Sequence, residues 1–133
     1  MTEPFIVFDT EYASWQGFLD APEEEKKKAE IVQIAALKIN SRDLSVAEKL
    51  NLYVKPRFAP KLTDYFINLT GITDERLQTE GVQPVKAAGQ IAKLMQNGPT
   101  LMIAHNAQFD ACFLRGLLRG QKVGRIDWLD SLT

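Results

Sequence analysis

The order of the predicted elements is the feature that most constrains this fold. Three strand-like segments come first, at residues 4–12, 30–40 and 44–56, and no strongly patterned crossover helix separates them. They are therefore expected to form a three-stranded antiparallel meander. Helices follow, and then a strand, a helix and a last strand. This order predicts an α/β fold in which a mixed sheet, made of the meander and two further strands, is flanked by helices.

Sequence signals also place the remaining elements. Residues 13–29 contain a glycine, a proline and a charge run, and this composition predicts a long loop. Threonine–aspartate pairs are suited to capping the two short helices that follow it. The predicted elements of the second half are helices at 63–69 and 73–78, an amphipathic helix at 85–95, a strand at 101–105, a helix at about 107–120 and a strand at 125–129.

Composition limits the class of protein. The 133 residues, 45% hydrophobic and 25% charged, suffice for one packed core, so residues 1–133 are predicted to be a single domain. A net charge of -1 argues against a protein that coats nucleic acid by bulk attraction. The single cysteine, Cys112, excludes an internal disulfide and favours a reducing compartment. No leader or membrane-length segment is evident. A small cytoplasmic domain is expected.

Two carboxylates at the end of the first strand are the first candidate functional residues. Asp9 and Glu11 follow a run of apolar residues, and positions i and i+2 of a strand point to the same side, with Cα atoms about 6.5–7 Å apart. That spacing allows both carboxylates to reach a shared divalent cation. The alternative is that they are ordinary strand-end acids that face water.

A second polar group follows the predicted strand at 101–105. His105, the only histidine, is at the strand end, and Asn106 and Asp110 come next. Open α/β sheets usually place their sites at the carboxyl ends of strands. Each residue also has a structural alternative, because Asn106 suits a helix cap, Asp110 suits the first turn of a helix, and a lone histidine often packs with a hydrogen bond.

Four motifs in order carry a resemblance to a known family. FDTEY at 8–12, EIVQIAALKI at 30–39, LTGIT at 69–73 and HNAQFD at 105–110 resemble the DEDD (DnaQ-like) 3'-5' exonucleases, in the KapD-type or RNase T-like branch. The resemblance implies an RNase H-like fold. HNAQFD also fits H-x-A-x-x-D, the family's third motif, but the strand before it and the helix after it favour the second motif.

The resemblance implies a two-metal hydrolase acting on the 3' end of single-stranded DNA or RNA. Asp9 would bridge two Mg²⁺ or Mn²⁺ ions, Glu11 would hold the first ion and Asp110 would help to place the second. The residues expected on the substrate side are Thr10, Tyr12, Leu69, Gly71, Ile72, His105 and Asn106.

One family motif is missing. No second H-x-A-x-x-D follows HNAQFD in the 133 residues, so the resemblance implies a domain that lacks its general-base histidine and fourth metal carboxylate. The chain is therefore expected to be incomplete at its C-terminus and weakly active or inactive alone. Two other classes stay open, namely an inactive nucleic-acid-binding or regulatory relative and an endonuclease resembling RNase H.

Overall fold

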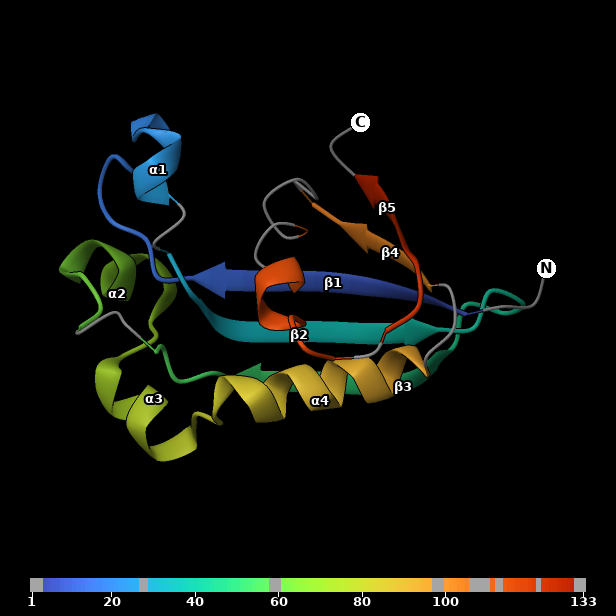
Figure 1. Ribbon diagram of the computed structural model, residues 1–133. Coiled ribbons are helices and arrows are strands. Elements are labelled where there is room, and N and C mark those ends of the chain that lie inside the picture. The colour runs from blue at the N-terminus through green and yellow to red at the C-terminus, as the bar shows by residue number, and fades with distance from the viewer. Residues whose placement is uncertain are drawn as a thin grey trace.

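The computed structural model describes residues 4–26, 29–57, 61–96, 100–105, 111, 114–121 and 123–130. Within these residues, five strands form one mixed sheet in the order β3-β2-β1-β4-β5, with helices beside it (Figure 1). The strands are β1 (Phe5–Tyr12), β2 (Ile31–Ile39), β3 (Val46–Tyr53), β4 (Thr100–Ala104) and β5 (Ile126–Asp130). The helices are η1 (Phe18–Asp20, a 3-10 turn), α1 (Glu23–Lys26), α2 (Asp64–Thr70), α3 (Asp74–Glu80) and α4 (Pro84–Met95).

Strand pairing confirms the predicted meander and the mixed sheet. β1 pairs antiparallel with β2, and β2 pairs antiparallel with β3. On its other edge β1 pairs parallel with β4, where Val7 lies opposite Ile103, and β4 pairs parallel with β5. β1 is therefore the central strand, and its carboxyl end lies at the same edge of the sheet as the carboxyl end of β4.

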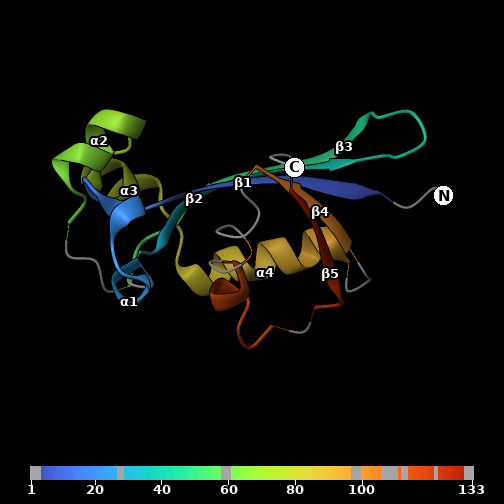
Figure 2. The same cartoon turned by 90° about the horizontal axis from the view of Figure 1, so that it is seen from above.

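One face of the sheet packs against α4, which runs along it in Figure 2. The alternating residues Ile6 and Phe8 of β1 are buried there, as are Ala88 and Ile91 of α4. Pro84 begins α4, where a missing N–H is tolerated, and Gln96 ends it in the left-handed conformation with φ 56°. The part of the predicted 107–120 helix that the structure describes is helical at 111 and 114–117, and Leu114 joins this core.

A second core cluster lies under α2 and α3. It contains Val32, Leu62, Phe66, Ile72 and Leu77. The two threonines predicted as caps do cap these helices: their side-chain oxygens, from Thr63 and Thr73, each accept a backbone N–H of the first turn. Gly71 ends α2 with φ 78°, a left-handed conformation that glycine adopts without a steric penalty.

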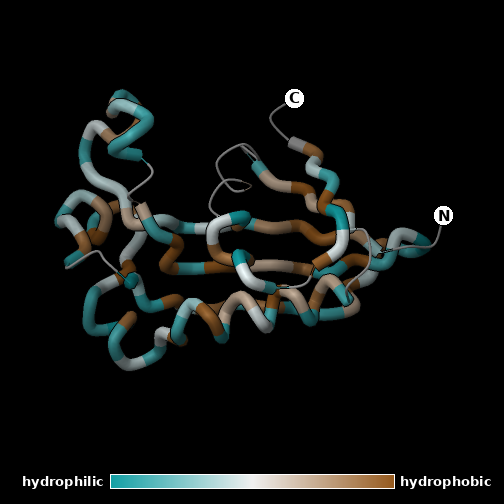
Figure 3. The backbone as a smooth tube through the Cα atoms, viewed as in Figure 1, coloured by the Kyte–Doolittle hydropathy of each residue, from teal (hydrophilic) through white to brown (hydrophobic). Residues whose placement is uncertain are grey.

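The face of the sheet opposite α4 is more open. Val7, Leu37 and Leu129 are 39%, 37% and 52% exposed there. Figure 3 shows that brown, hydrophobic residues alternate with hydrophilic ones along the strands of the sheet. Asp9 and Glu11 project from this same face, because they share the odd positions of β1 with Val7. Among the described residues, no helix is long and apolar enough to cross a membrane.

The connection at 13–29 is the long loop that its composition predicts, with short helical segments inside it. The charge run from residue 23 to residue 28 is itself compatible with a helical turn. It contains η1 and the single turn α1, and the first three residues of α1 are glutamates. Acidic side chains favour the amino end of a helix because the helix dipole is positive there. Phe18 anchors the connection, since it is only 4% exposed.

Candidate active site

The two acids of β1 lie at the open face of the sheet, at the carboxyl end of the strand. Asp9 is exposed and Glu11 is partly buried. Partial burial, followed by the negative charge of Asp9, raises the pKa of Glu11 above its ordinary value. The structure therefore shows the same-face position predicted for these carboxylates, and their negative charges repel each other.

A pocket of about 430 Å³ surrounds these acids. The carboxylates form part of its lining, the 13–29 connection supplies one wall and α2 supplies another. His105, which directly follows β4, completes the lining from the adjacent strand. The lining residues are Asp9, Thr10, Glu11, Tyr12, Ser14, Gly17, Phe18, Leu19, Asp20, Tyr65, Leu69 and His105.

The parallel ladder explains why His105 meets the acids. Val7 lies opposite Ile103 at the end of the β1–β4 pairing, and His105 directly follows β4, so it lies at the same edge of the sheet as Asp9 and Glu11. The two sequence features therefore converge at one edge of the sheet, as their positions at strand ends predicted. Asn106 and Asp110, also expected at this site, lie outside the described residues.

The donor set is compatible with a hard divalent cation. Asp9 and Glu11 offer carboxylate oxygens, the ligands that Mg²⁺ and Mn²⁺ prefer. A cation between them would also relieve the repulsion that contributes to the raised pKa of Glu11. Among the described residues, no group of three or more histidine, cysteine, aspartate or glutamate side chains is arranged to hold a metal ion. A complete cage therefore needs ligands from elsewhere, and Asp110 is the predicted third.

Aromatic packing shapes the wall that the 13–29 connection forms. The Tyr12 ring centroid lies 5.2 Å from that of Phe18, and the Trp15 centroid lies 4.9 Å from it in an edge-on arrangement. Gly17, with φ 83°, makes the sharp turn that brings Phe18 under these rings. The hydroxyl of Thr63 donates to the carbonyl of Ser14 at 2.8 Å, which ties this wall to α2.

The predicted substrate-side residues separate into two groups. Tyr12, Leu69 and His105 line the pocket, and so does Thr10, although its side chain belongs to the buried face of β1. Gly71 and Ile72 are not among the lining residues. Ile72 is 3% exposed in the second core cluster, so its burial supports a packing role.

Six lining residues were not among the residues predicted from the sequence, namely Ser14, Gly17, Phe18, Leu19, Asp20 and Tyr65. Tyr65 and Leu19 are the two of them that carry exposed apolar surface. Tyr65 precedes Leu69 by one helical turn, and this i,i+4 spacing could have indicated that both face the pocket. Leu19, 68% exposed, lies in a connection without periodicity, so no sequence signal pointed to it. Tyr65, Leu19 and Leu69, the last 66% exposed, give the pocket exposed apolar walls. Asp9 and Glu11 lie at its base.

Comparison with known proteins places the chain in a family. The RNase T family model, described as Exonuclease, matches residues 6–121. The chain is 28% identical over 131 residues to the PolC-type DNA polymerase III of Oceanobacillus iheyensis, covering 95% of this chain and 7% of that protein. It is 29% identical over 112 residues to the corresponding enzyme of Bacillus subtilis, covering 84% of this chain and 7% of that enzyme. It thus spans a small part of the length of these relatives.

Solved structures support the same fold. E. coli exonuclease I in complex with a dT13 oligonucleotide aligns with a TM-score of 0.74 and 20% identity, over 98% of this chain and 28% of that one. The nuclease domain of 3'hExo, a DEDDh family member bound to rAMP, aligns with a TM-score of 0.70 and 17% identity, over 92% and 61% of the two chains. The expected RNase H-like fold is confirmed, and the chain belongs to the RNase T exonuclease family, within the DEDD (DnaQ-like) superfamily.

Proposed function

We propose that this chain provides the metal-binding and substrate-binding core of a 3'-5' exonuclease that acts on single-stranded nucleic acid. The observation that carries the proposal is the Asp9–Glu11 pair in a pocket whose walls expose apolar side chains. The 3' end of a single-stranded nucleic acid needs such walls, because its unpaired bases stack on apolar and aromatic surfaces while its phosphate approaches the acids. The family match and the oligonucleotide bound to exonuclease I support this assignment.

Asp9 and Glu11 would hold divalent cations together with Asp110, as the DEDD motifs imply. Two bound Mg²⁺ or Mn²⁺ ions would supply Lewis-acid stabilisation of the attacking water and the leaving 3' oxygen. Leu69 and Tyr65 of α2 would hold the terminal base, and His105 would contact the terminal nucleotide from the β4 side. Tyr12 would support the opposite wall through its contact with Phe18.

The chain is proposed to hydrolyse its substrate slowly when tested alone. His105 is the only histidine in the 133 residues, and it is assigned to the second motif. A second histidine near neutral pKa, which would deprotonate the attacking water, is not encoded in this sequence. Substrate binding and metal binding therefore test the site more directly than turnover does.

Metal titration followed by thermal unfolding is the first experiment. Mg²⁺ or Mn²⁺ at about one hundred times its dissociation constant is expected to stabilise the folded chain by about 2.7 kcal/mol. Asp9→Asn should abolish this gain. Asp20→Asn is the matched control, because Asp20 lines the same pocket from η1 but is not a proposed ligand. Equal stabilisation of the wild type and Asp9→Asn would contradict the proposal.

Product analysis separates the competing classes. A single strand labelled at its 5' end should shorten one nucleotide at a time in Mn²⁺, and Asp9→Asn should stop this. Cleavage of a circular single strand would instead identify an endonuclease. Binding of the labelled strand with no shortening, even at high enzyme concentration, would favour an inactive nucleic-acid-binding relative, which the lone histidine makes the second candidate.

A further inference from the structure

A row of polar side chains crosses the open face of the sheet, starting from the acids. Glu11 lies directly opposite Gln33 of β2, and Gln33 lies directly opposite Tyr53 of β3. Directly opposed residues of antiparallel strands point to the same face. The Gln33 side-chain amide also donates from Nε2 to the side-chain oxygen Oδ1 of Asn51 at 3.3 Å. We call Gln33, Asn51 and Tyr53, with Arg76 of α3 at the end, the polar track.

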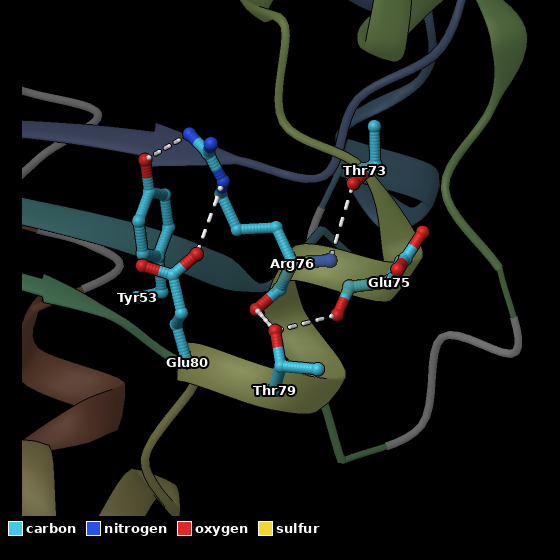
Figure 4. Close-up of polar contacts among 6 residues, drawn as sticks. All are labelled: Tyr53, Thr73, Glu75, Arg76, Thr79 and Glu80. Carbon is cyan, nitrogen blue, oxygen red and sulfur yellow. Dashed lines mark hydrogen bonds and ion pairs between the residues drawn. The ribbon is translucent and has the colours of Figure 1, made fainter.

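Arg76 is held in a defined position at the end of the polar track. Its Nη1 donates to the Tyr53 hydroxyl at 3.2 Å, and its guanidinium carbon lies 5.6 Å from the centroid of the Tyr53 ring. Its Nε lies 3.2 Å from a carboxylate oxygen of Glu80, one helical turn away. Figure 4 shows these contacts, with the guanidinium pointing away from α3 toward Tyr53.

The arrangement leaves Arg76 able to bind an anion. A guanidinium has five N–H donors in a planar fork that matches phosphate oxygens, and the two polar contacts of the Arg76 side chain use Nη1 and Nε. Half of the side chain is exposed. Exposed ion pairs contribute little to stability, so fold stability gives no strong reason for a pre-positioned guanidinium here.

We propose that Arg76 binds a backbone phosphate of the single-stranded substrate and thereby positions the strand along the polar track. This inference rests on the proposed function. Glu11 and Tyr53 are two strand spacings apart, or about 10 Å, so Arg76 meets a phosphate other than the one at the acids. Gln33 of β2 lies between Glu11 and Tyr53, and Asn51 lies beside Tyr53 on β3. Their amides can hydrogen-bond the intervening nucleotide. Glu80 competes with the phosphate for the guanidinium.

Fluorescence anisotropy with a labelled single-stranded oligothymidylate of about twelve nucleotides, in Ca²⁺ to suppress hydrolysis, tests the proposal. Loss of one phosphate contact from a single strand should lower affinity about fivefold at about 0.1 M salt and make the plot of log K against log salt shallower by about 0.7. Arg76→Gln should show both changes. Arg76→Lys should keep most of the salt slope, because it keeps the charge.

The matched control is Arg125→Gln, which removes the same charge elsewhere. Arg125 Nε lies 3.2 Å from an Asp127 carboxylate oxygen, the same distance as in the Arg76 pair, but at the amino end of β5, away from the pocket. It should leave affinity and salt slope unchanged. Glu80→Gln, which removes the competing carboxylate, should strengthen binding, and it tests the inference even if Arg76→Gln fails to fold.

The results separate the two levels of proposal. If the wild type binds the oligonucleotide while Arg76→Gln and Glu80→Gln both match it in affinity and salt slope, the role of Arg76 is wrong and the proposed function stands. Equal weakening by Arg125→Gln and Arg76→Gln would also overturn it, because bulk charge would then explain both. If the wild type does not bind single strands at any salt concentration, the proposed function itself fails.

Discussion

Replacing Phe66 with alanine tests whether the second core cluster holds the α2 wall of the pocket. Phe66 is 1% exposed and packs within the cluster that α2, α3 and β2 share. Phenylalanine-to-alanine changes in cores cost about 3–5 kcal/mol, through lost burial and the cavity that remains. Since Phe66 is almost fully enclosed, we expect a loss of about 4 kcal/mol. Total stabilities of domains are only about 5–15 kcal/mol, so the effect should be large.

Leu69→Ala provides the comparison within the same helix. Leu69 lies three residues after Phe66 but is 66% exposed and lines the pocket. Its replacement should change stability by no more than about 0.5 kcal/mol, while weakening oligonucleotide binding. Urea unfolding followed by circular dichroism gives both free energies from the midpoints at constant m-value. A loss below about 1.5 kcal/mol for Phe66→Ala, or equal losses for the two variants, would refute the division of α2 into a core face and a pocket face.

Two further predictions concern the acids and the helix caps. Partial burial, and then the charge of Asp9, raise the pKa of Glu11, so the metal-free folded state holds the Glu11 proton more tightly than the unfolded state does. Stability should therefore fall as the pH rises from 4.5, the ordinary pKa of this carboxyl group, through its raised pKa in the folded state. Glu11→Gln should remove that component from urea midpoints measured in EDTA between about pH 4 and pH 7, and an unchanged profile would refute it. Thr63→Ala should cost about 1 kcal/mol for the lost cap and about 0.5 kcal/mol more for the hydrogen bond to Ser14. Thr73→Ala removes only the cap bond from the Arg76 backbone N–H and should cost about 1 kcal/mol. Equal urea midpoints for Thr63→Ala and Thr73→Ala would mean that the hydrogen bond from Thr63 to Ser14 adds no stability.

Much of the fold was predictable because its signals are local. Alternation and apolar runs located β1, β2 and β3, and threonine caps located the starts of α2 and α3. Same-face placement of Asp9 and Glu11 followed from the two-residue period of a strand. The approach of His105 to these acids was predictable because His105 and the acids all lie at the carboxyl ends of strands.

Other features depend on tertiary packing that no short pattern encodes. Leu69 and Ile72 are similar residues in the same motif, but the turn at Gly71 sends one to the pocket and the other to the core. Leu19 reaches the pocket through the turn at Gly17. Arg76 meets Tyr53 only because α3 packs against the end of β3.

The central position of β1 also has a consequence for how the chain folds during synthesis. Its edge toward β2 can pair as soon as the next strand is made, but its other edge waits for β4, about ninety residues after β1. At about 5–20 residues per second, a ribosome takes about 5–20 s to make that stretch. An unpaired strand edge is a template for pairing with other chains. The strand that carries Asp9 and Glu11 thus keeps an unpaired edge in the nascent chain until β4 is made, and slower translation of the stretch between β2 and β4 should increase aggregation.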